Sequence, residues 1–158
     1  MNSERIPSPS SLAFMLKNGR PDEVLFRLDQ SVEGYTSVMS GTTAQREIKL
    51  LCTHGSGGTG LMIAKAADGN SITFLSHVGG NYKWAKSGII PDPGRYYHVV
   101  GVYDKAAAKT YIYVDGVKKA EVAASGNYKH ANVTWLCVGG DSGSNNLAEC
   151  LFNGDIAI

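Results

Sequence analysis

Residues 96–116 read YYHVVGVYDKAAAKTYIYVDG, and this stretch decides how the chain folds. It contains two runs of aromatic and β-branched residues, 96–103 and 109–114, with a short polar turn between them. Such residues favour strands because they suit a pleated, half-buried surface. Asp115-Gly116 follows the second run, and glycine there supplies the positive φ that a two-residue hairpin loop needs. The stretch therefore predicts a meander of antiparallel strands.

The same pattern of short β-type runs continues through the rest of the chain. Glycine accounts for 19 of the 158 residues, well above the usual share of about 7%, and it separates these runs. Short strands spaced by about 8–12 residues predict a β-sandwich or barrel and argue against alternating strands and helices. Only residues 43–49 could begin a short helical turn. The expected strands are residues 12–16, 24–28, 35–39, 47–52, 60–65, 71–77, 81–86, 96–103, 109–114, 117–122, 133–138 and 151–158.

We expect one domain over residues 12–158, after a flexible segment rich in Ser and Pro at 1–11. A chain of 158 residues that is 43% hydrophobic can bury a core without a metal or disulfide staple. Its net charge of +1 argues against nucleic acid or an anionic membrane as a partner. No apolar stretch approaches the roughly 20 residues that span a bilayer. The first residues lack the apolar core of a signal peptide, so the protein is cytosolic or its leader lies outside this chain.

The three cysteines, Cys52, Cys137 and Cys150, form an odd set without CxxC spacing, which argues against a zinc site. Buried thiols are the expected state, because cysteine behaves as a small hydrophobic residue. The alternative is a bridge between Cys137 and Cys150 that closes the glycine-rich loop between them.

That loop also holds a candidate calcium site. Asp141 and Asn145 lie within the run GGDSGSNN at 139–146, and carboxylate and amide oxygens are ligands that calcium prefers. The spacing differs from that of an EF-hand. Exposed turns favour the same residue types, so a solvated turn is the competing interpretation. Calcium is the only cofactor that the sequence suggests.

Catalytic carboxylates are not evident from the sequence. Glycoside hydrolysis needs two carboxyl groups about 5–5.5 Å or 6.5–9.5 Å apart across the sugar. Residues i and i+2 of a strand share a face about 7 Å apart, so such groups can appear as alternating carboxylates. The chain has no Glu-x-Asp-x-Glu run. We therefore expect no catalytic residues, although carboxylates distant in sequence could still converge.

Aromatic residues are the better candidates for ligand contact. Carbohydrate sites combine an apolar ring, on which a sugar stacks, with a few polar groups that bind hydroxyls. Tyr82 and Trp84 share one face of the expected strand 81–86, and Asn81 lies beside them. Tyr128 and His130 lie near the following loop, and we include them in the predicted site. The competing interpretation is that these aromatic residues belong to the core between two sheets.

Residues 96–116 also carry a family resemblance, together with Val-Gly-Gly at 138–140 and Phe-Asn-Gly-Asp-Ile at 152–156. With looser matches at 57–63 and 71–74, these segments cover residues 47–158. The chain resembles the laminin-G-like modules of the concanavalin A-like lectin/glucanase superfamily. The resemblance implies an all-β, two-sheet antiparallel jelly-roll sandwich. It also implies glycan or protein binding without catalysis, sometimes aided by calcium, in secreted, periplasmic or cell-surface bacterial proteins, including those of Bacteroidetes where such modules accompany hydrolases.

Three departures from the family pattern matter. Ala157 stands where family members commonly have an acidic residue, which weakens a calcium site at that corner. The chain ends at Ile158, before the family's final Val-x-Ile-Tyr strand, and the usual Phe-Asp-Gly strand near the N-terminus is not recognisable. We therefore expect a sandwich truncated at its ends, within a longer protein. An exposed edge strand could then pair with a second copy or a further domain.

The first functional hypothesis is a non-catalytic, lectin-like module that binds a glycan or polysaccharide. The second is a structural or protein-interaction domain appended to a hydrolase, with an adjacent catalytic domain as its partner. The third is a jelly-roll glycoside hydrolase with dispersed carboxylates.

Overall fold

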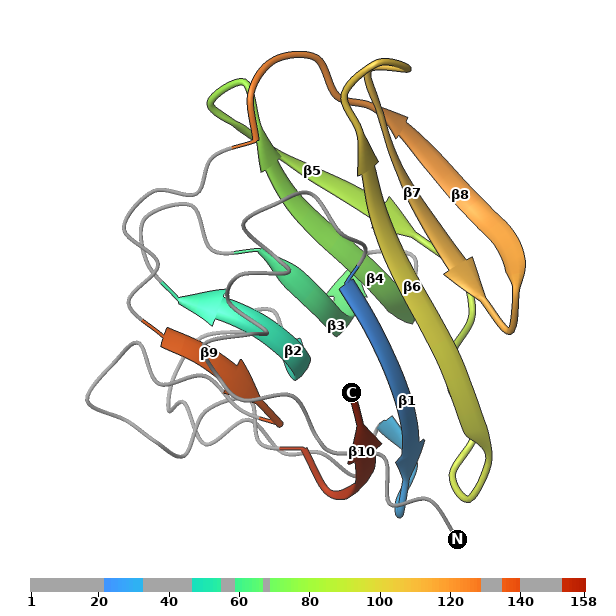
Figure 1. The fold of residues 1–158 in the computed structure, drawn as a ribbon. Coiled ribbons are helices and arrows are strands. Elements are labelled where there is room, and N and C mark those ends of the chain that lie inside the picture. The colour runs from blue at the N-terminus through green and yellow to red at the C-terminus, as the bar shows by residue number, and fades with distance from the viewer. Residues whose placement is uncertain (1–21, 33–46, 55–58, 67–68, 129–134, 140–151) are drawn as a thin grey trace, which may run out of the picture.

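The computed structural model describes residues 22–32, 47–54, 59–66, 69–128, 135–139 and 152–158 (Figure 1). Within them, all the regular elements are strands, in two five-stranded antiparallel sheets. Sheet A has the order β10-β1-β6-β7-β8 and sheet B the order β5-β4-β3-β2-β9. The predicted all-β jelly-roll sandwich is therefore confirmed. The strands are β1 (Asp22–Leu28), β2 (Glu47–His54), β3 (Gly60–Ala66), β4 (Gly69–Val78), β5 (Asn81–Lys86), β6 (Tyr96–Asp104), β7 (Lys109–Val114), β8 (Val117–Ala123), β9 (Trp135–Val138) and β10 (Gly154–Ala157).

Most of the expected strands that fall on described residues differ from the observed ones by only one or two residues at either end. The last is the exception, because 151–158 shortens to the four residues of β10. The prediction of a helical turn at 43–49 is wrong for residues 47–49, because they belong to strand β2. There, β2 pairs with β3, so sheet pairing overrides a weak local preference. The expected strands 12–16 and 35–39, residues 43–46 and the segment 1–11 lie outside the described residues.

The meander predicted from residues 96–116 is present as β6, β7 and β8. Asp115 and Gly116 have φ values of 51° and 75°, as in the two-residue turns that match the twist of a hairpin. The Asp115 carboxylate accepts hydrogen bonds from the backbone N–H of His98 (3.0 Å) and from the Arg95 guanidinium (2.8 Å). The side chain of Asp115 thus ties the turn to the neighbouring strand β6.

The core lies between the two sheets and is filled by alternate residues of each strand. In β1, Val24, Phe26 and Leu28 are fully buried, whereas Leu25 between them is 40% exposed on the outer face. The Phe26 ring stacks on that of Tyr97, with 5.6 Å between ring centroids, and meets Phe152 edge-on at 6.2 Å. This aromatic cluster joins β1, β6 and the segment before β10, so it closes one side of the sandwich.

Gly101 lies directly against an aromatic ring of the opposite sheet. It lies on the inner face of β6, and a Cβ atom added to it would lie 2.4 Å from two carbons of the Phe74 ring. Phe74 belongs to β4 of the opposite sheet and is 2% exposed. The absence of a side chain at residue 101 therefore makes the space that Phe74 fills.

The outer face of sheet A carries ion pairs between neighbouring strands. Lys109 of β7 and Lys118 of β8 both donate to the Glu121 carboxylate, the latter at 2.8 Å. These hydrogen bonds, first from Lys109 and then from Lys118, lower the pKa of Glu121 to about 2. The carboxylate is exposed, so solvent screens this interaction.

This ion pair predicts a small pH dependence of stability. Because the pKa of Glu121 is lower in the folded state than its usual value of about 4.3, its contribution is present above about pH 4.3 and is lost as the pH falls toward 2. We expect the melting temperature of wild type to exceed that of Glu121→Gln near neutral pH, with the gap closing toward about pH 2.5. Thermal melts over this range check it, and a gap that widens in acid would contradict it. Added salt should shrink the gap.

Candidate functional site

The β4–β5 hairpin presents the most exposed aromatic ring among the described side chains of sheet B. Tyr82 of β5 pairs directly with His77 of β4, and the two rings stack with 4.5 Å between centroids and 18° between planes. Tyr82 is 51% exposed, whereas His77 is 6% exposed. One face of the tyrosine ring therefore lies against the imidazole, and the solvent-facing part of the ring is held in a fixed orientation.

Trp84 lies two residues farther along β5, on the same face as Tyr82, as the pleat of a strand requires. It packs against Met62 and Leu75, which are 1% and 7% exposed, and it is itself partly buried. The indole thus serves partly as cover for these residues and partly as exposed surface. Its position beside Tyr82 extends the aromatic surface along β5.

Asn81 begins β5 and is exposed. Its side-chain amide donates to the carbonyl oxygen of Gly79 at 3.1 Å, which fixes the amide at the tip of the hairpin. Tyr82 and Trp84 together form one surface, called here the β5 platform, whereas Asn81 pairs with Val78 and points to the other face at the end of the strand. All residues from 71 to 78 of β4 are buried, so the exposed part of this face of the hairpin lies on β5.

The β4–β5 hairpin is held by the segment that follows β8. The N–H of Gly79 donates to the carbonyl of Asn127 at 3.0 Å, and a Cβ on Gly79 would lie 2.4 Å from the carbonyl oxygen of Ser125. A Cβ on Gly126 would in turn lie 2.8 Å from the Cα of Gly79. In Figure 1, the hairpin, this segment and the β6–β7 turn meet at the upper end of the sandwich.

Tyr128 belongs to that segment, but it lies on a different side of β4 from Tyr82. It forms an isolated β-bridge with Val78, which is fully buried. Its ring packs against that of Tyr103, with 5.6 Å between centroids, and the Tyr103 hydroxyl donates to the carbonyl of Gly126 at 2.5 Å. Val78 and His77 are consecutive, so their side chains point to opposite faces. The structure therefore groups Tyr82 with Trp84, and it places both Asn81 and Tyr128 on the other face, the one that Val78 occupies.

His77 is a part of this surface that the sequence analysis missed. A two-residue turn at Gly79-Gly80 aligns Val78 with Asn81 and His77 with Tyr82, so the turn itself was the available signal. His77 is buried, and its Nδ1 atom has no hydrogen-bond partner among the described residues. We therefore assign the imidazole the role of a support on which the Tyr82 ring rests.

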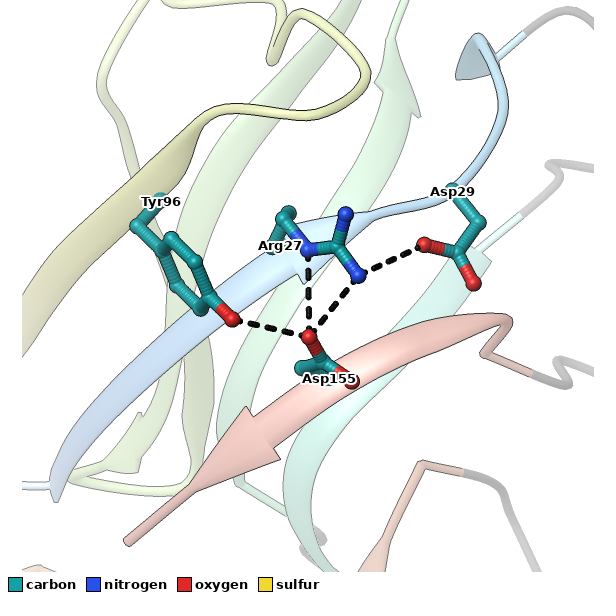
Figure 2. Close-up of polar contacts among 4 residues, drawn as sticks. All are labelled: Arg27, Asp29, Tyr96 and Asp155. Carbon is teal, nitrogen blue, oxygen red and sulfur yellow. Dashed lines mark hydrogen bonds and ion pairs between the residues drawn. The ribbon is translucent and has the colours of Figure 1, made fainter.

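A second polar cluster lies on the outer face of sheet A, near β10 (Figure 2). Arg27 donates to one oxygen of Asp155 through Nε (3.1 Å) and Nη2 (2.9 Å), and Tyr96 donates to the same oxygen at 2.8 Å. Asp29 lies 3.1 Å from the same guanidinium. The hydrogen bonds from Tyr96 and Arg27 lower the pKa of Asp155. This carboxyl group is therefore suited to fastening β10 to β1 and β6, and poorly suited to donating a proton.

Other described carboxylates also make structural contacts. Glu23 lies 2.6 Å from the imidazole of His98 on the next strand, and Asp104 accepts from the N–H of Ala107 at 2.9 Å in the β6–β7 turn. No group of three His, Cys, Asp or Glu that could hold a metal occurs among the described residues. The predicted calcium ligands Asp141 and Asn145, and the predicted contact residue His130, lie outside those residues.

The two antiparallel sheets define a jelly-roll sandwich. The family model of the concanavalin A-like lectin/glucanases superfamily matches residues 23–157, and the chain belongs to this family. The resemblance predicted from residues 96–116 is thereby confirmed.

A solved structure from Bacteroides ovatus, of a protein provisionally named a carbohydrate-binding protein, is similar to this chain with a TM-score of 0.60 and 21% sequence identity. The match covers 87% of this chain and 35% of that protein, so the chain spans about a third of its length. At this identity the match supports the fold alone. No curated protein matches the chain. In the part of the chain that the structure describes, no helix is long and apolar enough to cross a membrane.

Proposed function

We propose that this domain is a non-catalytic carbohydrate-binding module whose sugar contact is the β5 platform. The observation that carries the proposal is the Tyr82 ring, which is 51% exposed and stacked on the buried His77. An aromatic ring held in place loses little conformational freedom when a ligand binds. The name given to the Bacteroides ovatus protein supports the same substrate class.

The platform offers the two kinds of contact that a sugar needs. The apolar C–H face of a pyranose would stack on the exposed part of Tyr82, with Trp84 beside it for a second residue of the chain. Asn81 and Lys83 alternate with these rings along β5 and point to its other face, so they could contribute only where a sugar extends past the edge of the platform. The Asn81 amide N–H is used on Gly79, and its carbonyl oxygen can accept from a hydroxyl at the tip of the hairpin.

We further propose that the module acts outside the cytoplasm of a bacterium, as part of a longer protein. The chain matches about a third of the Bacteroides ovatus protein. A match of this extent is expected if the domain is one module that is joined to other domains. An adjacent hydrolase that acts on the same polysaccharide is the expected partner, because a tethered module raises the local concentration of substrate.

The β5 platform predicts that Tyr82→Ala weakens sugar binding by at least about tenfold, equivalent to about 1.4 kcal/mol. A glycan array, run with and without calcium, would first identify a ligand, and titration calorimetry with that ligand would then compare the variants. Tyr96→Ala is the matched control, because Tyr96 is also 51% exposed but lies on sheet A. Thermal melts would establish that both variants are folded.

Three results would contradict this proposal. The first is a wild-type protein that binds no polysaccharide on the array, with or without calcium. The second is a Tyr82→Ala variant that binds as tightly as wild type. The third is a Tyr96→Ala variant that loses binding while Tyr82→Ala retains it, which would move the site to the outer face of sheet A.

A protein-interaction domain is the second candidate function. The observation in its favour is the exposed apolar surface of sheet A, where Leu25 is 40% exposed and Val117, at the start of edge strand β8, is 54% exposed. Lys118 and Lys119 follow Val117, and lysines on an edge strand oppose pairing with another sheet. Light scattering after size exclusion would favour this candidate if the domain formed dimers that Val117→Lys disrupts.

A further inference from the structure

Strands β2 and β9 place two cysteines directly opposite each other. The antiparallel register pairs Leu51 with Val138, Cys52 with Cys137 and Thr53 with Leu136. Cys52 is buried, with 5% of its surface exposed. The sequence analysis expected buried thiols and gave a bridge between Cys137 and Cys150 as the alternative, whereas the register places Cys52 opposite Cys137.

The hydrogen-bond pattern gives the spacing of this pair. The N–H of Gly139 donates to the carbonyl of Leu50 at 3.1 Å, so residues 50 and 139 form a hydrogen-bonded pair of the ladder. Hydrogen-bonded and non-hydrogen-bonded pairs alternate along antiparallel strands. Two residues farther on, Cys52 and Cys137 are therefore again a hydrogen-bonded pair, with Cα atoms about 5.5 Å apart. Disulfides commonly join Cα atoms at about 5.5–6 Å.

The same geometry makes a bridge at this position strained. Cβ atoms of directly opposite residues lie about 4.5–5.5 Å apart, and a hydrogen-bonded pair is at the wide end of this range. A disulfide needs its Cβ atoms near 3.8 Å, so the two strands must be drawn together to form it. Strained disulfides are more easily reduced than relaxed ones, and they are the labile or regulatory kind.

We propose that Cys52 and Cys137 form a reversible cross-strand disulfide that fastens the four-residue strand β9 to β2. Among the described strands, β9 is outermost in sheet B and pairs with β2 alone, so a covalent link would secure this end of the sheet. The reaction is thiol–disulfide exchange with a small disulfide such as oxidised glutathione. One thiolate attacks the oxidant to give a mixed disulfide, and the second thiolate displaces the remaining glutathione thiolate. The two protein thiols lose two electrons and two protons in total, and the oxidant is reduced to two thiols.

The test uses the full chain, equilibrated in glutathione buffers from fully reduced to fully oxidised and then alkylated under denaturing conditions. We expect alkylated thiols to fall from the three of the reduced chain to one as the buffer becomes oxidising, and to return when dithiothreitol is added. Peptide mapping identifies the bridge. Because trypsin leaves Cys137 and Cys150 on one peptide, a second protease that cleaves before Asp141 is needed to separate them.

The expected result is a linked pair of peptides that contain Cys52 and Cys137, absent from Cys137→Ser and retained in Cys150→Ser. Mapping on the wild-type chain does not depend on any variant folding. Three outcomes would overturn the proposal: a Cys137–Cys150 link, three alkylated thiols in the most oxidising buffer, or a Cys52–Cys137 link that persists in reduced glutathione. The last outcome would describe a permanent staple and would contradict the reversible bridge.

Discussion

Replacing Phe26 with alanine is expected to lower the free energy of unfolding by about 3–5 kcal/mol, the usual cost of emptying an aromatic site in a core. The side chain is fully buried between the sheets and contacts the rings of Tyr97 and Phe152 at once. Its removal leaves a cavity at the junction of β1, β6 and the segment before β10. A loss of this size is a large part of the 5–15 kcal/mol that stabilises a typical domain.

Urea denaturation of wild type, Phe26→Ala and Leu25→Ala measures this effect. Leu25 is the matched control, because it neighbours Phe26 on β1 but is 40% exposed on the outer face. Its replacement should change the free energy of unfolding by only about 0.5 kcal/mol. If Phe26→Ala is too unstable to purify, Phe26→Leu should show a smaller loss of about 1 kcal/mol. Equal losses at residues 25 and 26 would contradict the observed orientation of β1.

Gly101→Ala is expected to destabilise the fold by about 1–3 kcal/mol, although alanine is usually tolerated in a strand. The added methyl group would lie 2.4 Å from carbons of the Phe74 ring, and a ring buried between two sheets has little room to move. Either the ring leaves its preferred rotamer or the sheets separate locally. Both responses weaken packing between β6 and β4.

A double-mutant cycle with Phe74→Leu identifies the cause of that loss. Leucine at residue 74 removes the ring that the new methyl group meets, so the double variant should be more stable than the sum of the two single effects predicts, by about 0.5 kcal/mol or more. Chemical denaturation of the four proteins provides the measurement. Strict additivity would show that Gly101→Ala acts through backbone conformation and not through contact with Phe74.

Features that depend on residues close together in the chain could be predicted from the sequence, whereas features that depend on pairing between distant strands could not. The meander β6, β7 and β8 was predicted within one residue, because alternation and the Asp115-Gly116 turn act between neighbours in the chain. Residues 47–49 allowed either a helical turn or a strand, and it is pairing with β3 that fixes them as a strand. β1 was predicted as a strand, but its place between β10 and β6 could not be predicted from its own residues. No local pattern states which strands become neighbours.

The residues of the candidate site also differ in how well the sequence predicted their positions. Tyr82 and Trp84 share a face because the pleat places alternate residues of a strand on the same side, whereas Asn81 pairs with Val78 and points to the other side. Tyr128 was added for its nearness to the hairpin, but its orientation depends on its bridge to Val78. His77 could have been found, since the two-residue turn fixes its pairing with Tyr82. Whether these residues bind sugar stays a prediction that the Tyr82→Ala experiment addresses.

The backbone contact between Gly79 and Gly126 bears on how this domain can change during evolution. Neither position can accept a side chain without displacing main-chain atoms of the other segment, so the hairpin cannot shift to accommodate a new ligand. Sequence changes are instead expected at the exposed side chains of β5, because replacing them does not alter the backbone of the hairpin. Homologues with different preferences should therefore differ at positions 81–84 while keeping the hairpin at the same length. Altered specificity could then be introduced by exchanging these few residues between homologues.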